Sequence, residues 1–248
     1  MNSLSEGLKE LKLKAFAKHY EKMAQKCESS NQAFIEYLEE LVNLELELRH
    51  HQKISRLIKL AKLPRKKSLK NFDITRIKGL SKTLIQTLAK GEFIEKHENI
   101  LIFGNPGTGK THLAIALAEE WCISGYKVFF ITAAALMQEL LKAKSELKLN
   151  QYIKKIDKYE MLIIDDISYI PCSKEESDVL FNLLSQRYEM KSCLITSNIA
   201  FSKWSQIFKD EVTTAAVIDR LIHHANILEL NATSYRIENA KNLNKFLK

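Results

Sequence analysis

The chain has 248 residues, a net charge of +8 and 46% hydrophobic residues. This length and composition suit one large domain, or one domain with a small appendage, that buries a hydrophobic core. No apolar run approaches the roughly 20 residues that span a bilayer. The polar Asn2 and Ser3 begin no secretory leader, so we expect a cytoplasmic protein without a membrane partner.

The first 63 residues are expected to be helical. Ser3 and Glu6 form a capping-box pattern, and two apolar stripes have helical spacing. The first stripe comprises Leu4, Leu8, Leu11 and Ala15, and the second comprises Phe34, Leu38, Leu41 and Val42. The sequence leaves open whether the second helix continues through Ile54–Ala61 or breaks before it. Pro64 should end the helical region, and a bundle this small is marginally stable alone.

Positive charge is concentrated near residues 50–70. Between His50 and Phe72 there are eight basic residues and no acidic one, namely Lys53, Arg56, Lys59, Lys62, Arg65, Lys66, Lys67 and Lys70. Such a run is either a solvated face or a footprint for nucleic-acid phosphates, and its unbroken length favours nucleic acid. We therefore expect two domains. Residues 1–70 form a helical domain that binds DNA or a partner, and residues 71–248 form a catalytic domain.

The residues after this run are expected to form a basic linker over 64–75 and a helix over 80–90, which Gly91 ends. From Asn99 onward, strands and helices alternate. The expected strands are 99–103, 127–132, 161–165, 193–197 and 227–230. The expected helices are 110–123, 134–148, 150–157, 174–189 and 213–224. This alternation predicts an α/β fold, with a parallel sheet covered by helices on both faces.

A phosphate-binding loop (P-loop, or Walker A motif) follows the first of these strands. Its residues are Gly104, Asn105, Pro106, Gly107, Thr108, Gly109, Lys110 and Thr111, and His112 continues into the helix. Glycines let backbone amides approach an anion, and the helix N-terminus adds partial positive charge. We expect these residues, His112 included, to bind ATP. Lys110 should reach the β- and γ-phosphates, and the Thr111 hydroxyl should ligate Mg²⁺.

Two further strand ends supply polar groups. The third strand ends in Asp165 and Asp166, at the edge of a parallel sheet where ligands bind. Asp165 is expected to hold Mg²⁺, and Asp166 to orient or deprotonate the attacking water. The next strand ends at Asn198, our first choice for bonding the water or the γ-phosphate, with Thr196 second.

Arginines and paired histidines occur late in the chain. Arg220, on the last helix, could reach the γ-phosphate of a neighbouring subunit, or it could make an ordinary contact within its own chain. Arg236 is a weaker candidate for a γ-phosphate sensor. The pairs His50-His51 and His223-His224 are adjacent in sequence, and adjacent residues on a helix do not share a face. With four cysteines also far apart, the sequence assigns no zinc site.

Taken together, these motifs resemble the insertion-sequence ATP-binding proteins of the IstB type, in the AAA+ superfamily, which are related to DnaC-type helicase loaders. The resemblance covers nearly the whole chain. The most specific matches are Asp165-Asp166, Thr196-Ser197-Asn198, Trp204 and Asp219-Arg220-Leu221, and Ser234-Tyr235-Arg236 follows in the same order. An aspartate at position 166 is usual in this group.

The resemblance implies a five-stranded AAA+ core and an ATPase that oligomerises on double-stranded DNA, recruits or regulates a transposase, and disassembles on hydrolysis. Arg220 would act across the subunit interface. In related initiator ATPases a helix between the second and third strands faces DNA. The matching stretch here, 134–158, either faces DNA in the same way or is a solvated face. Two alternatives are a helicase loader acting in replication and a small-molecule kinase. The kinase is disfavoured, because no acceptor site or arginine-rich lid is evident.

Overall fold

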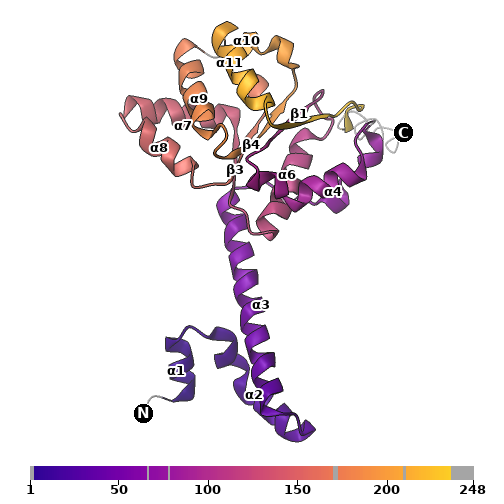
Figure 1. Cartoon of the computed structure of the whole chain (residues 1–248), viewed down its shortest axis with the longest axis vertical. Coiled ribbons are helices and arrows are strands. Elements are labelled where there is room, and N and C mark those ends of the chain that lie inside the picture. The colour runs from indigo at the N-terminus through magenta and orange to yellow at the C-terminus, as the bar shows by residue number, and fades with distance from the viewer. Residues whose placement is uncertain (1–2, 66, 78, 170–172, 209–210, 236–248) are drawn as a thin grey trace, which may run out of the picture. The chain divides into compact units, whose positions relative to one another are not determined.

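The computed structural model describes residues 3–65, 67–77, 79–169, 173–208 and 211–235 (Figure 1). Its internal contacts divide the chain into two compact units, Met1–Arg56 and Leu57–Lys248. Among the described residues, no helix is both long and apolar enough to cross a membrane.

The first unit contains α1 (Leu4–Glu10), α2 (Lys14–Ser30) and most of α3 (Phe34–Ala61). The capping box at Ser3 and Glu6 is confirmed. The apolar stripe from Leu4 to Ala15, however, does not lie on one helix, because Lys12 turns the backbone to φ 58°. The buried carboxylate of Glu45 on α3 accepts a hydrogen bond of 2.7 Å from the amide of Ala15. This long-range bond at the first turn of α2 fixes where α2 begins.

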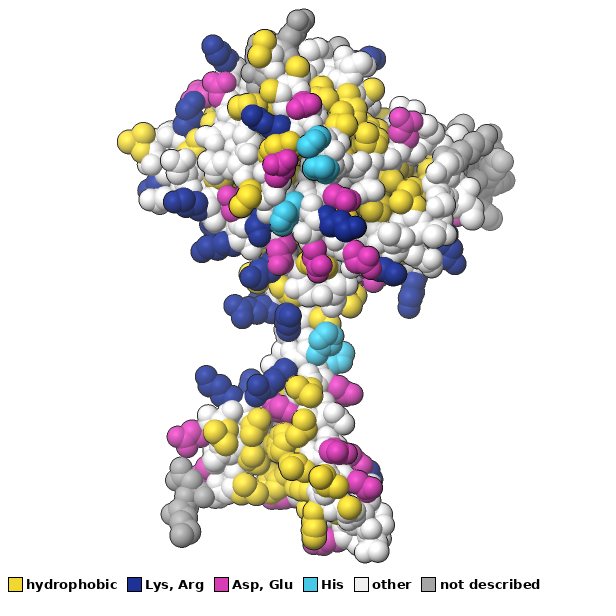
Figure 2. All heavy atoms as spheres, in the orientation of Figure 1, with side chains coloured by type: hydrophobic (Ala, Val, Ile, Leu, Met, Phe, Trp, Pro, Cys, Tyr) yellow, Lys and Arg dark blue, Asp and Glu magenta, His cyan; other side chains and the backbone are white. Residues whose placement is uncertain are grey.

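The first unit leaves much of its apolar surface exposed. Leu41 is 1% exposed, whereas Phe34 is 87% exposed and Leu38 51%. Hydrophobic side chains are correspondingly prominent on the surface of this unit in Figure 2. The second stripe therefore forms a helix, as expected, but buries few of its members.

Helix α3 continues to Ala61, which answers the question left open by the sequence. Its last turn belongs to the second unit, because Leu57 and Ala61 are buried in the core of that unit. The units therefore divide at residue 56, earlier than the expected boundary at 70. The expected linker over 64–75 contains two short 3₁₀ turns, η1 (Leu69–Asn71) and η2 (Ile74–Arg76).

Helix α4 (Lys82–Lys90) follows, and Gly91 ends it with φ 80°, as predicted. A short helix, α5 (Glu92–Glu95), comes next and was not expected.

The second unit is built on a five-stranded sheet in the order β2-β3-β4-β1-β5. The strands are β1 (Asn99–Phe103), β2 (Val128–Thr132), β3 (Met161–Asp165), β4 (Ser192–Ser197) and β5 (Ala225–Glu229). Every pairing is parallel. The longer helices are α6 (Lys110–Ile123), α7 (Ala133–Ser145), α8 (Leu149–Ile156), α9 (Lys174–Arg187) and α11 (Glu211–Ile222), and α10 (Ser205–Phe208) is short.

Helices cover both faces of this sheet, which confirms the predicted fold class (Figure 1). Along β1, Ile100 and Ile102 pack in one hydrophobic cluster with residues of α4 and α6. Leu101 points the other way, into a second cluster with residues of α7, α9 and α11. This alternation is what a parallel strand buried on both faces requires.

The last helix and strand lie earlier than expected. We predicted them at 213–224 and 227–230, and they lie at 211–222 and 225–229. The amide of Asn99, at the start of β1, donates to the carbonyl of His224 at 2.7 Å. The last helix must therefore end in time for the chain to reach β1, and His223 and His224 fall beyond its end.

Candidate nucleotide-binding site

The phosphate loop joins β1 to α6 and depends on two glycine positions. Gly104 has φ 154°, and a Cβ there would lie 2.6 Å from the carbonyl oxygen of Leu230. Gly107 has φ 83°, and a Cβ there would overlap the side chain of Ser234. A larger residue at either position would push the loop away from the segment that follows β5.

Lys110 is held inside this loop. Its ammonium donates to the carbonyl oxygens of Gly104 at 2.7 Å and of Asn105 at 3.1 Å, and the residue is only 8% exposed. The Thr108 hydroxyl also donates to Asn105 O, at 2.9 Å. A positive charge thus lies at the N-terminus of α6, where backbone amides already favour an anion.

Thr111 and Asp165 meet across the site. The Thr111 hydroxyl donates to the two carboxylate oxygens of Asp165, at 2.9 and 3.1 Å. Thr196 on β4 also donates to Asp165, at 2.7 Å, and accepts the amide of Asp166 at 2.8 Å. A hydroxyl and a carboxylate are oxygen donors of the kind Mg²⁺ prefers, so these residues fit the ion that the sequence suggests.

Thr196 was our second choice for contacting the attacking water. Its hydroxyl binds the carboxylate of Asp165 and the backbone amide of Asp166, so it fixes the Asp165 side chain and the backbone of Asp166. The contact of Asp166 with Thr196 accompanies an unusual backbone, because Asp166 has φ 63°. Non-glycine residues rarely adopt this left-handed conformation.

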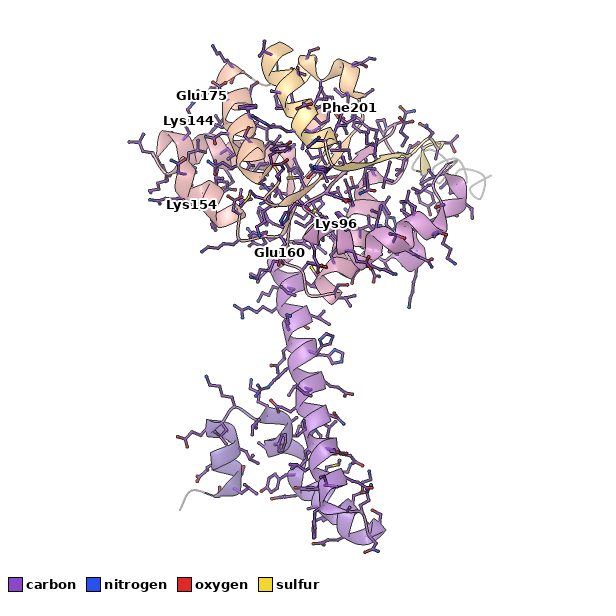
Figure 3. All side chains as sticks on the ribbon, viewed as in Figure 1. Lys96, Lys144, Lys154, Glu160, Glu175 and Phe201 are labelled. Carbon is purple, nitrogen blue, oxygen red and sulfur yellow. The ribbon has the colours of Figure 1, made fainter. Side chains whose placement is uncertain are left out.

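Asn198 lies beside the phosphate loop. Its backbone amide donates a hydrogen bond of 2.8 Å to the Ser168 hydroxyl. The backbone amide of Gly104 donates to the neighbouring carbonyl of Ser197 at 3.3 Å. A cleft of about 350 Å³ opens here between the ends of β1, β4 and β5. Its lining includes Gly104, Asn105, Asn198, Phe201, Glu229 and Asn231. Phe201, labelled in Figure 3, packs against Phe103 with ring centroids 4.4 Å apart.

The side chain of His112 contacts Phe72. Its ring packs edge-on against Phe72, with centroids 5.4 Å apart. Burial, followed by the positive charge of Lys67, lowers the pKa of His112 below its ordinary value. We expected His112 among the nucleotide-binding residues. The structure gives its side chain a packing contact with the segment that precedes α4.

Sequence reasoning did not find the contacts made by the segment after β5. The amide of Tyr235 donates to the carbonyl of Gly107 at 3.0 Å. The guanidinium of Arg76 lies over the Tyr235 ring, 4.9 Å from its centroid. No local sequence pattern predicts these contacts, because they join residues far apart in the sequence. Arg236, the weaker sensor candidate, lies outside the described residues, as do Lys66 and Cys172.

Arg220 lies near the amino-terminal ends of the strands, whereas its own phosphate loop lies at their carboxyl-terminal ends. The carbonyl of Leu221, the next residue, accepts a 3.2 Å hydrogen bond from the side chain of Asn99, at the start of β1. The loop begins after the end of β1, a five-residue strand that spans about 16 Å at the rise of a parallel strand. Within its chain, Arg220 donates to Ser185 Oγ at 2.5 Å and lies over the Phe181 ring.

The parallel sheet, the phosphate loop and the Thr111–Asp165 pair define a P-loop nucleotide-binding core. A family model described as "IstB-like ATP binding protein" matches residues 6–243. The chain therefore belongs to the IstB-like ATP-binding protein family of insertion sequences.

Two relatives illustrate the match. The chain is 35% identical over 238 residues to the "Insertion sequence IS21 putative ATP-binding protein" of Pseudomonas aeruginosa, covering 96% of this chain and 90% of that protein. It is 37% identical over 227 residues to the IS5376 putative ATP-binding protein of Geobacillus stearothermophilus, covering 92% of this chain and 90% of that protein.

Solved structures support the fold at lower identity. AMPPCP-bound DnaA from Aquifex aeolicus has a TM-score of 0.58 and 20% identity, over 74% of this chain and 56% of that one. The DnaC helicase loader has a TM-score of 0.53 and 20% identity, over 59% of this chain and 86% of that one. At this identity the two similarities show a shared fold.

Proposed function

We propose that this chain is an ATPase that helps DNA transposition. It binds ATP, assembles with further copies on target duplex DNA, recruits or regulates a transposase, and hydrolyses ATP to disassemble. The observation that carries the proposal is the meeting of Thr111 with Asp165 beside Lys110, because it joins a triphosphate site to a metal-ligand pair. The role in transposition is supported by relatives named for insertion sequences over 90% or more of this chain.

In this proposal each residue at the carboxyl edge of the sheet has a separate role. Lys110 and the loop amides bind the phosphates, and Asp166 and Asn198 orient the attacking water from two neighbouring strand ends. Thr111 and Asp165 hold Mg²⁺, which when bound neutralises negative charge that develops on the phosphates. Thr196 keeps both acids in place through its two hydrogen bonds.

Arg220 completes the site of a neighbouring copy. Because it lies at the amino-terminal ends of the strands, Arg220 is too far from its own loop to contact it. This position suits an arginine that stabilises transition-state charge in the site of a neighbouring copy. Hydrolysis would then require assembly. The chains would therefore assemble first, and the hydrolysis that separates them would follow. The contact of Arg220 with Ser185 holds the side chain within its own chain until a neighbour is present.

Duplex DNA is proposed to bind through the basic run. The side chains of Lys59, Lys62, Arg65 and Lys70 are exposed. The stretch over 134–158 is a weaker candidate, because its lysines are partly neutralised. Lys144 pairs with Glu175 at 3.0 Å, and both residues are labelled in Figure 3. Lys148 pairs with Glu146 at 3.0 Å. Lys154, on α8, remains exposed.

The test combines ATP turnover with particle size. Purified chain is assayed for ATP hydrolysis alone, with duplex DNA and with single-stranded DNA, and the ATP-bound species is sized by light scattering. We expect duplex DNA to stimulate turnover and ATP to produce a larger particle. Absence of ATP binding would refute the site. Binding of a replicative helicase instead of a transposase would favour the helicase-loader alternative.

A further inference from the structure

A second group of metal-binding side chains lies where α9 and α11 end. Glu189, His223 and His224 each offer a ligand atom, these atoms lie within 4.8 Å of one another, and all three side chains are exposed. Figure 2 shows histidine side chains beside acidic ones on this unit. None of the three residues takes part in the nucleotide site.

The two histidines face the same way because they are not helical. The sequence predicted a helix through residue 224, on which adjacent side chains would diverge. Helix α11 ends at Ile222, and the two imidazole centroids lie 4.1 Å apart. The reason for excluding a metal there was therefore wrong. The turn is fixed from the sheet, since the His224 carbonyl accepts the amide of Asn99.

Contacts from α9 orient the third ligand and one imidazole. Glu189 follows the end of α9 with φ 57°, and its carboxylate lies 3.9 Å from Nδ1 of His223. The Tyr188 hydroxyl lies 2.9 Å from the same nitrogen. Ligands of a tetrahedral zinc ion are about 3.3 Å apart, given bonds near 2.0 Å. Metal binding through Nδ1 of His223 would displace the Tyr188 hydroxyl, and rotation of the exposed side chains would bring the ligand atoms closer.

We propose that Glu189, His223 and His224 bind one divalent transition-metal ion, such as Zn²⁺. Two imidazoles and one carboxylate form a ligand set suited to Zn²⁺, Ni²⁺ or Cu²⁺ rather than Mg²⁺. Three protein ligands leave the fourth position open to water or to a further ligand. The site lies at the amino-terminal ends of the strands, whereas Thr111 and Asp165 lie at the carboxyl-terminal ends. It is therefore separate from the proposed Mg²⁺ site.

A bound ion would join α9 to α11 beside Arg220. One bond already connects these helices, from Arg220 to Ser185, and a second connects the residues that follow them, Tyr188 and His223. The amide of His223 also donates to the carbonyl of Asp219, in the helical turn that carries Arg220. The ion would fix this turn. Any consequence for hydrolysis rests on the proposed role of Arg220, so the test measures metal binding itself.

The experiment titrates Co²⁺, a spectroscopic substitute for Zn²⁺, into the full chain without nucleotide or histidine tag. We expect one equivalent to give the visible absorption of a low-coordinate cobalt site, and equimolar Zn²⁺ to remove it. His224→Gln and Glu189→Gln should each weaken binding by more than about tenfold. Both residues are exposed, so melting temperatures without metal should match that of the unaltered chain.

Two control variants locate the metal. His50→Gln with His51→Gln removes another histidine pair, and Asp165→Asn removes the carboxylate of the nucleotide site. Both should bind Co²⁺ like the unaltered chain. The proposal is overturned if the unaltered chain gives no saturable cobalt spectrum, or if His224→Gln leaves the spectrum and affinity unchanged. Loss of the spectrum in Asp165→Asn alone would place the ion at the nucleotide site and equally overturn it.

Discussion

Thr111 and Asp165 lie 54 residues apart in sequence and share a hydrogen bond of 2.9 Å. One belongs to the first turn of α6 and the other to the last position of β3. The bond therefore joins the phosphate loop to the acidic end of β3 within a single chain. Binding of a triphosphate and its ion needs no large rearrangement of these two residues.

Replacing Lys110 should remove nucleotide binding. Lys110→Ala deletes the charged donor inside the loop, and hydrogen bonds to charged groups contribute about 1.5–3 kcal/mol each. We expect ATP affinity to fall by at least about tenfold, measured by titration with a fluorescent ATP analogue. Lys96→Ala, at an exposed lysine of the same unit (Figure 3), is the control and should bind normally. Retained affinity in Lys110→Ala would refute the site.

Removing the Thr196 hydroxyl should impair hydrolysis more than binding. Thr196→Val keeps the shape of the side chain but leaves Asp165 and the Asp166 amide without their shared partner. A buried polar group left unpaired costs about 1–3 kcal/mol, so we expect lower unfolding free energy and slower turnover. Thr196→Ser should restore both. Equal turnover in the Val and Ser variants would show that this hydroxyl does not position the acids.

Arg220→Ala should bind ATP normally and hydrolyse it at least about 1000-fold more slowly. Because Arg220 is proposed to serve a neighbour, mixing Arg220→Ala with Asp166→Asn, which keeps the ATP-binding loop, should recover part of the turnover. A mixed interface pairs an intact Asp166 with an intact arginine. Ser185→Ala removes the same contact within the chain and should remain active. If mixing recovers nothing while both variants assemble, the trans role is wrong.

Neutralising the basic run should weaken DNA binding and its dependence on salt. Lys59→Gln, Arg65→Gln and Lys70→Gln together remove three exposed charges. Each lost phosphate contact should reduce the slope of log affinity against log salt by about 0.9. The measurement is fluorescence anisotropy with duplex DNA at several salt concentrations. Neutralising the exposed Lys82, Lys90 and Lys96 is the control. Equal slopes in the two triple variants would exclude the run as the footprint.

His112 should make stability depend on pH. Burial and the nearby Lys67 charge lower its pKa in the folded chain, so below its ordinary pKa the unfolded chain binds more protons. Stability should therefore fall as the pH drops below about 6.5. Urea unfolding at pH 5.5 and 7.5 measures the loss, which should be smaller in His112→Gln. The same loss in both proteins would show that other groups cause it.

Local patterns predicted much of this molecule. The strands 99–103 and 161–165 and the helix 110–123 have the predicted bounds, because each is a continuous apolar segment with a clear end signal. Features set by distant contacts were missed. The capping of α2 by Glu45, the double role of Thr196 and the contact of Tyr235 with Gly107 each depend on residues that only the fold brings together.

The placement of Arg220 has a consequence for any array of these chains. If each copy lends its arginine to the next, the contact is head-to-tail, and such contacts close into rings or continue as open filaments. In an open filament the terminal copy with an exposed phosphate loop receives no arginine. That copy would hydrolyse its ATP last. Subunits would therefore be lost first from other positions, and the filament would disassemble in one direction.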